Sequence, residues 1–79
     1  MTARHLRAKR AAAGIPGYAV CRLVGISRAK LSDIEREHVV ATSEELQQIN
    51  GAIEQIIHVK QRLSKLATEA GLSLTGVHL

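Results

Sequence analysis

The sequence has almost no aromatic side chains: Tyr18 is the only one, and Phe and Trp are absent. Its core must therefore be built from Ala, Val, Ile and Leu, a composition that favours small packed helices. The single cysteine, Cys21, cannot form an internal disulfide, which fits a reducing cytoplasm. No apolar run approaches the roughly 20 residues of a membrane span. We therefore expect a cytoplasmic protein with no membrane partner.

Patterns for catalysis or metal binding are also missing. The histidines show no metal-ligand spacing, and no second cysteine supports them. Cys21 lacks an activating neighbour and falls at an apolar position. The segment "GIPG" lacks both the Lys-Ser/Thr of a phosphate-binding loop and the strand that precedes one. We expect neither an enzyme nor a cofactor.

The charges are distributed unevenly along the 79 residues. Residues 1–36 carry eight Lys or Arg and two acids, a net charge of +6, whereas residues 37–79 carry three basic and five acidic residues, a net charge of −2. The first half is therefore the candidate surface for a polyanion, and the second half is expected to have a different role.

Glycine and proline mark two helices in the first third of the chain. Gly14 stops a predicted helix over residues 2–13. Pro16 suits the first turn of a second helix over residues 16–24, because the N–H that it lacks would have no partner there. Gly25 can adopt the positive φ of a sharp turn.

Two further helices follow. Ser27 is a good N-cap for a helix over residues 28–37. Thr42 and Glu45 form a capping box that opens the last helix. Nothing stops this helix before Ala70 except a tolerable glycine, and no strand is expected anywhere.

The third helix has a buried side and an exposed side. Leu31 and Ile34 lie three residues apart and face the core. The exposed side carries Arg28, Ala29, Ser32 and Asp33. Two short helices joined by a glycine-containing turn form a helix-turn-helix, and a polar outer face in a basic neighbourhood suits a helix that reads a DNA major groove.

Several linked segments carry a family resemblance: "LRAKRAAAGI" for the first helix and its exit, "VCRLVGISRAKLSDIE" for the helix-turn-helix, and "SEELQQINGAI" for the following helix. Small Cys21 stands four residues before Gly25, and Ile26 follows that glycine. With these features residues 6–53 resemble the lambda-repressor-like helix-turn-helix domains of phage repressors, Cro proteins and related bacterial regulators, the XRE family. The resemblance implies an all-α fold, a compact four- to five-helix domain with an extended C-terminal helix.

The resemblance also implies roles for individual residues. Arg28, Ala29, Ser32 and Asp33 would face the bases. Contacts to DNA phosphates would come from Gly17, Tyr18, Ser27 and Lys30, with further attraction from Arg7, Lys9 and Arg22. Arg10 would pair with Glu35 as a structural ion pair. Asp33 is equally consistent with a local charge partner of Arg36 or Lys30.

Two positions depart from the family pattern. Gly17 stands where the family often has a glutamine that clamps a phosphate. Glu37 stands where the family often has a glycine. We expect a weaker phosphate clamp on that side, with backbone amides at the start of the second helix as the remaining donors.

The last helix is too long for a compact domain of this size. A continuous helix from residue 43 to 70 would measure about 42 Å, against an expected radius of gyration of about 12 Å. Either the helix breaks near Gly51 or His58 and folds back as a fifth helix, or its overhang packs on a second copy, which we favour. We therefore divide the chain into a DNA-binding domain, residues 1–55, and a C-terminal helical extension and tail, residues 56–79. The expected dimer interface comprises Ile56, Ile57, Leu63, Leu66, Ala67 and Ala70.

These features predict a sequence-specific double-stranded DNA-binding regulator of the bacterial cytoplasm or nucleoid. We expect a small phage-type or bacterial repressor that binds a palindromic operator as a homodimer, with half-sites about one helical turn apart. One alternative is the antitoxin of a toxin–antitoxin pair, with the C-terminal helix binding a toxin. Another is a protein-interaction module that uses the same scaffold without binding DNA.

Overall fold

The structure, a computed structural model, describes residues 2–69. Within this part of the chain there are four helices and no strand: α1 (Ala3–Ala12), α2 (Gly17–Val24), α3 (Arg28–Glu35) and α4 (Ser43–Glu69). The predicted all-α class is therefore confirmed. Ala70 of the expected interface and the predicted tail, residues 71–79, lie outside the described residues.

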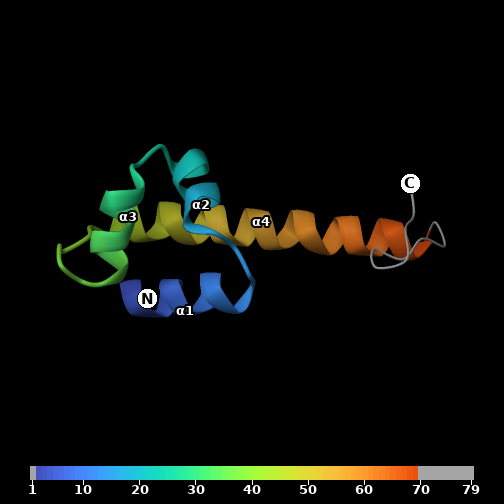
Figure 1. Cartoon of the computed structure of the whole chain (residues 1–79), viewed down its shortest axis with the longest axis horizontal. Coiled ribbons are helices and arrows are strands. Elements are labelled where there is room, and N and C mark those ends of the chain that lie inside the picture. The colour runs from blue at the N-terminus through green and yellow to red at the C-terminus, as the bar shows by residue number, and fades with distance from the viewer. Residues whose placement is uncertain (1, 70–79) are drawn as a thin grey trace.

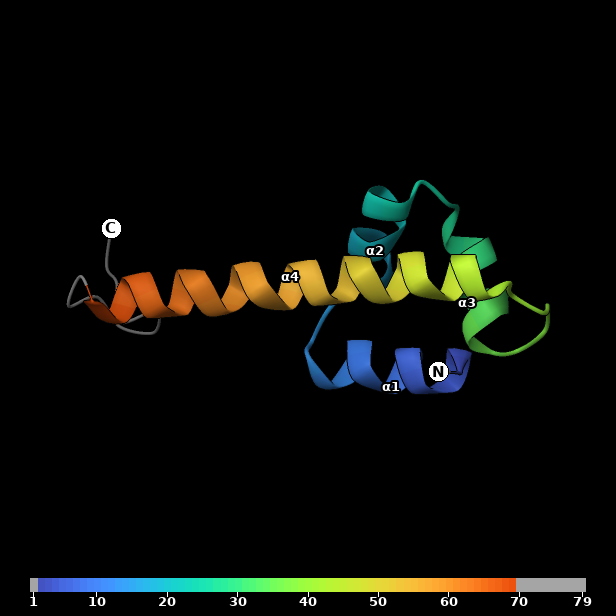
Figure 2. The same ribbon diagram turned by 180° about the vertical axis from the view of Figure 1, so that it is seen from behind.

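The three short helices gather around the first half of α4 (Figures 1 and 2). α1 and α2 both pack on α4, and α3 packs on α1 and α2. The core between them is made of aliphatic side chains and one thiol. Its buried members are Ala3, Leu6, Ile15, Val20, Cys21, Leu31, Ile34, Ile49, Ala52 and Ile53.

Local capping interactions set the ends of α1 and the start of α2. The Thr2 hydroxyl accepts a hydrogen bond from the His5 N–H at 3.1 Å, and Gly14 ends α1 with φ 68°. The helix predicted over residues 2–13 is one residue shorter at each end. Pro16 has extended backbone, φ −71° and ψ 149°, so it precedes α2 as its N-cap instead of opening its first turn.

Residues 25–27 form the turn between α2 and α3. Gly25 takes φ 82°, and its N–H donates to the Cys21 carbonyl at 2.8 Å. The Ser27 hydroxyl accepts from the Lys30 N–H at 3.1 Å, as expected of an N-cap. This short connection fixes the direction in which α3 leaves α2.

α3 ends two residues earlier than the predicted residue 37. The cause is Glu37, whose φ of 61° is left-handed and cannot continue a right-handed helix. Its carboxylate lies 3.5 Å from the Arg4 guanidinium, and both side chains are exposed. Glutamate therefore occupies a backbone conformation that glycine adopts more easily.

α4 begins at the predicted capping box. The Thr42 hydroxyl accepts from the Glu45 N–H at 3.1 Å, and the Glu45 carboxylate accepts from the Thr42 N–H at 3.0 Å. The helix then runs without interruption through Gly51 and His58 to Glu69. The alternative in which it breaks and folds back is therefore wrong for the described residues.

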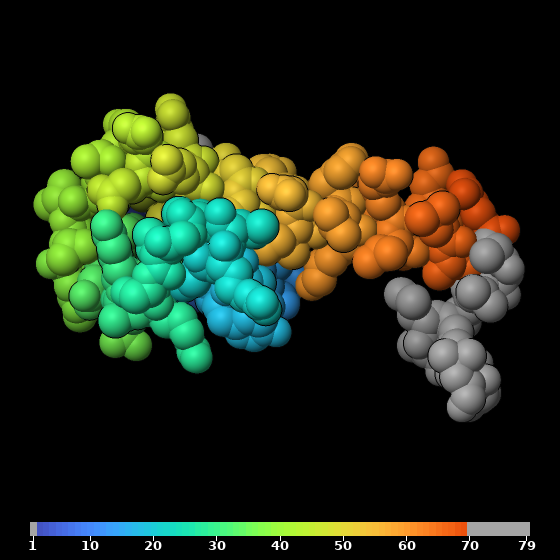
Figure 3. Space-filling model, turned by 90° about the horizontal axis from the view of Figure 1, so that it is seen from above, coloured from blue at the N-terminus to red at the C-terminus, as the bar shows by residue number. Residues whose placement is uncertain are grey.

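The second half of α4 extends beyond the other helices (Figure 3). Its 27 residues give a length of about 40 Å, and the molecule measures 46 × 20 × 20 Å. Lys60 marks the edge of the compact part, because its ammonium donates to the Ala13 carbonyl at 3.0 Å. We call residues 61–69 the overhang.

The left-handed backbone at residue 37 predicts a stabilising substitution. Glu37→Gly should raise the free energy of unfolding by about 0.5–1 kcal/mol, because the strain of a left-handed L-residue is relieved and an exposed ion pair contributes little. Urea denaturation measures the change.

Gly25→Ala is the matched variant with the opposite expected effect, a loss of stability. A Cβ at Gly25 would meet no atom within 4 Å, so its cost reports the backbone conformation alone. We expect a loss of about 1–2 kcal/mol. If the two substitutions changed stability in the same direction, backbone strain would not explain either.

Candidate nucleic-acid interface

The outer face of α3 presents the residues expected to read bases. Arg28, Ala29 and Asp33 are exposed and Ser32 is half-buried, while Leu31 on the opposite side is buried. The helical repeat places the four on one side of α3. This surface offers a guanidinium, a methyl group, a hydroxyl and a carboxylate within two turns.

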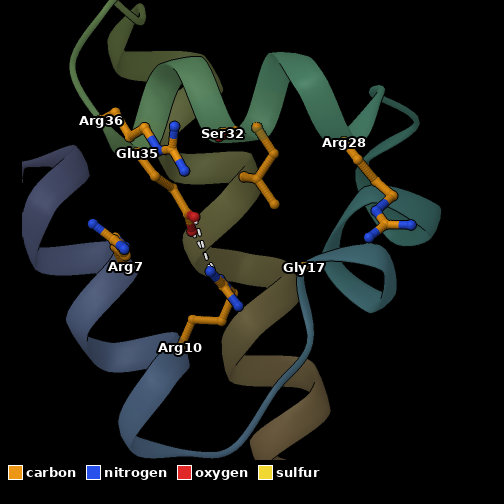
Figure 4. Close-up of a pocket in the computed structure, with 8 residues that line it drawn as sticks. Arg7, Arg10, Gly17, Arg28, Ser32, Glu35 and Arg36 are labelled. Carbon is orange, nitrogen blue, oxygen red and sulfur yellow. Dashed lines mark hydrogen bonds and ion pairs between the residues drawn. The ribbon is translucent and has the colours of Figure 1, made fainter.

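A cavity of about 180 Å³ lies beside this face, between α1, the start of α2, and α3 (Figure 4). Figure 4 shows arginine side chains from α1 and from α3 around the same hollow. The lining consists of four arginines, one carboxylate, one glycine and two further side chains of α3: Arg7, Arg10, Arg28, Arg36, Glu35, Gly17, Leu31 and Ser32.

One ion pair organises the floor of the cavity. The Arg10 guanidinium donates two hydrogen bonds to the Glu35 carboxylate, at 2.8 and 2.9 Å, and a third to the Ile15 carbonyl at 2.8 Å. Glu35 is only 7% exposed, so its charge needs this partner. The hydrogen bond to Glu35 raises the pKa of Arg10 above its ordinary value. The expected structural pair is thus present and joins α1 to the end of α3.

The other arginines of the cavity keep their charge available. Within residues 2–69, no carboxylate lies within 4 Å of the guanidinium of Arg7, Arg28 or Arg36. The only acidic side chain in the lining, Glu35, is already bound to Arg10. The cavity is therefore a site of concentrated positive charge next to the start of α2, whose backbone N–H groups also attract anions.

The structure distributes the remaining candidate phosphate residues over several places. Gly17 lines the cavity, and Tyr18 and Arg22 are exposed on α2. The Ser27 hydroxyl caps α3, and the Lys30 ammonium lies 3.3 Å from the Glu45 carboxylate of α4. Lys30 is thus held on the side of α3 that faces the start of α4.

Lys9 is turned away from the cavity. Its ammonium contacts the Glu54 carboxylate and donates to the Asn50 amide oxygen at 3.0 Å, and both residues belong to α4. Its observed role is to hold α1 against α4. The sequence around Lys9 gives no local signal of these two contacts, because Asn50 and Glu54 lie more than 40 residues away.

Asp33 has a neighbour other than those expected. Its carboxylate lies 3.8 Å from the His38 imidazole, while Lys30 pairs with Glu45 and no ion pair with Arg36 forms in the described part of the chain. Its side chain is exposed and, like Ala29, lies outside the cavity that Arg28 and Ser32 line.

Arg36 is a cavity residue that the sequence patterns did not single out. It lies one turn after Ser32, so helical spacing alone could have placed it on this side of α3. Arg10, expected only as a structural residue, also lines the cavity.

The expected dimer residues fall into two groups. Ile56 and Ile57 are half-buried and pack against the core. Leu63 and Leu66 are 59% and 56% exposed. Val59, which is not among the expected interface residues, is 48% exposed, and Ala67 is half-buried.

Residues 2–69 contain neither a candidate metal site nor a candidate membrane span. No group of three or more His, Cys, Asp or Glu side chains there could hold a metal ion. No helix in this segment is both long and apolar enough to cross a membrane. No protein-family model, curated protein or solved structure matches the chain.

The burial of the Glu35 carboxylate leads to a prediction about the free energy of unfolding. Arg10→Ala would leave Glu35 buried without its cation, and we expect the free energy of unfolding to fall by about 3–5 kcal/mol. Thermal or urea denaturation measures the loss. The double variant Arg10→Met/Glu35→Leu removes both charges and should lose less than Arg10→Ala. Equal stability of Arg10→Ala and the parent would show that the pair contributes nothing.

The capping box predicts a pH effect. The Thr42 N–H and, next, Lys30 hold the pKa of Glu45 below its ordinary value. The charged form therefore stabilises the fold above the ordinary glutamate pKa, and this contribution is lost as the pH falls through the folded-state pKa. Lys30→Ala should raise the pKa of Glu45 only part of the way to its ordinary value, because the Thr42 N–H remains. NMR titration of the carboxyl groups measures the pKa of Glu45 in this variant. An unchanged pKa would exclude a contribution from Lys30.

Proposed function

We propose that this protein is a sequence-specific double-stranded DNA-binding regulator in which α2, the turn at residues 25–27 and α3 act as a helix-turn-helix. The observation that carries the proposal is the juxtaposition of two features. The polar outer face of α3 borders a cavity in which Arg7, Arg28 and Arg36 have no carboxylate partner among the described residues. A polyanion with regularly spaced charges and readable edges fits both.

In this arrangement α3 enters the major groove. Arg28 donates two hydrogen bonds to guanine, the Ala29 methyl contacts a thymine methyl, and Asp33 accepts from cytosine. Ser32 pairs with any of several base edges. Together these four residues supply the sequence specificity.

The cavity holds the DNA backbone. Arg7 and Arg36 contact phosphates on the side of α1, and the backbone amides at Gly17 replace the side-chain clamp that a glutamine would provide. Tyr18 and Arg22 extend the contact along α2. These contacts fix the position of α3 and carry no sequence information.

The regulator acts as a homodimer that represses by occupying a palindromic operator. Support for a dimer comes from the apolar side chains that α4 exposes at and beyond the edge of the compact part, Val59, Leu63 and Leu66. A palindrome matches the two-fold symmetry of such a dimer.

The same exposed side chains favour one second candidate, an antitoxin. In that case α4 binds a toxin while α3 binds the operator of the shared operon. Co-purification of a different protein in fixed stoichiometry from the native host would favour the antitoxin, whereas recovery of the chain alone would favour the repressor.

Selection of binding sites from a random duplex pool, at near-physiological salt, tests the proposal directly. We expect an enriched inverted repeat. Weak binding without enrichment that disappears as salt is added would show phosphate attraction alone and would overturn the proposal.

Single substitutions then separate the two kinds of contact. Arg28→Ala should weaken binding to the selected site by about 1–3 kcal/mol and relax the preference at one base pair. Arg36→Ala should weaken binding to all sequences about equally and reduce the salt slope by about 1. Lys65→Ala, which removes the same charge from the exposed end of α4, is the control and should change neither.

A further inference from the structure

The apolar residues of α4 continue in one pattern from the core into the overhang. Spacings of three and four alternate without a break along Ile49, Ala52, Ile56, Val59, Leu63 and Leu66. This is the a/d pattern of a coiled coil. The first two are buried in the core, Ile56 is half-buried, and the last three are about half exposed. We call the last three the seam.

The position of the seam restricts how a second helix can cover it. A parallel partner in register would have to run alongside Ile49 and Ala52 as well, but that side of α4 is covered by the short helices of the same chain. An antiparallel partner would avoid these short helices, because its own compact part would lie past residue 69, on the side of the overhang away from α1, α2 and α3.

The charged side chains beside the seam can pair with opposite charges of a second copy in only one of these two directions. Arg62 and Glu69 lie on the same flank of the seam, seven residues apart. In a parallel pair, residues of this flank face the opposite flank of the partner, where Lys60 and Ala67 lie. In an antiparallel pair, the flank that carries Arg62 and Glu69 faces the same flank of the partner. The register that packs Leu63 against the partner's Leu66 then sets Arg62 against the partner's Glu69, twice by symmetry.

We propose that residues 60–69 pair with the same segment of a second copy as an antiparallel two-stranded coil, in the register that places Leu63 on the partner's Leu66. Arg62 has no carboxylate within 4 Å in the described part of the chain, and Glu69 has only an exposed local neighbour, Lys65, at 3.9 Å. Both are therefore available to the partner.

This pairing also sets the distance between the two proposed DNA-binding surfaces of the dimer. The operator spacing derived from it rests on the proposed function. The contact between Lys30 and Glu45 places α3 at the start of α4. The midpoint of the coil falls between residues 64 and 65, so the two copies of Glu45 are separated by roughly 60 Å at 1.5 Å per residue. The two α3 helices would thus lie at opposite ends of the dimer, and operator half-sites would be spaced closer to two turns than to the one turn expected from the sequence.

Charge exchange tests the coil without DNA. Arg62→Glu alone and Glu69→Arg alone each place like charges opposite one another, and each should weaken dimerisation by about tenfold or more in sedimentation equilibrium. An equimolar mixture of the two variants should recover parental affinity as a heterodimer, and so should the double variant Arg62→Glu/Glu69→Arg. Lys65→Glu, on the outer side of the helix, is the control. Monomers at all concentrations, or no recovery on mixing, would overturn the proposal.

A distance measurement tests the direction of pairing. In a Cys21→Ala background, spin labels at Glu44→Cys should be separated by roughly 60 Å. A short separation would show a parallel dimer or a different interface and would also overturn the proposal. Because neither measurement contains DNA, failure of the coil and failure of operator binding are separate results.

Discussion

The ion pair between Arg10 and Glu35 is the interaction on which the arrangement of the short helices depends. Glu35 is the last residue of α3 and is almost completely buried, so its carboxylate must be bound by a cation with good geometry. Arg10 supplies that cation from α1, and its third hydrogen bond reaches the Ile15 carbonyl just before α2. One guanidinium therefore fixes the end of α3, the last turn of α1 and the entry into α2. The cavity forms around these three segments, and the charge of Glu35 is already balanced by Arg10.

The basic residues divide into two groups according to what they contact. Three lysines hold the helices together: Lys9 binds α4 from α1, Lys30 binds α4 from α3, and Lys60 binds the end of α1 from α4. Several arginines, among them Arg28 and Arg36, have no acidic partner in residues 2–69 and remain available at the surface. A guanidinium suits this position because its planar group of donors matches a phosphate or a guanine edge. The proposed DNA contacts thus use the cations that the fold does not need.

α4 uses a single apolar stripe for two purposes. Its first half closes the core through Ile49 and Ile53, which are almost completely buried. Its second half presents side chains of the same pattern that no other helix within residues 2–69 covers. The rigidity of a continuous helix joins these two halves, so any partner of the overhang is held at a fixed distance from α3. The oligomeric state and the spacing of the proposed DNA-binding surfaces are consequently set by the same element.

The sequence by itself determined the helical class and most helix ends, because caps and left-handed glycines act within one turn of the chain. Ser27, Thr42 with Glu45, and Gly25 all act as the sequence predicted. The exposed face of α3 was also predictable, since it is the side opposite Leu31 and Ile34. Only the tertiary structure decided that Lys9 faces α4, that Arg36 joins the cavity, and that Val59 replaces Ile57 in the exposed stripe. It also decided that α4 does not break, because Gly51 is tolerated where the flanking residues Ile49, Ala52 and Ile53 are anchored in the core. These outcomes depend on contacts between residues far apart in the chain, for which local sequence patterns carry no signal.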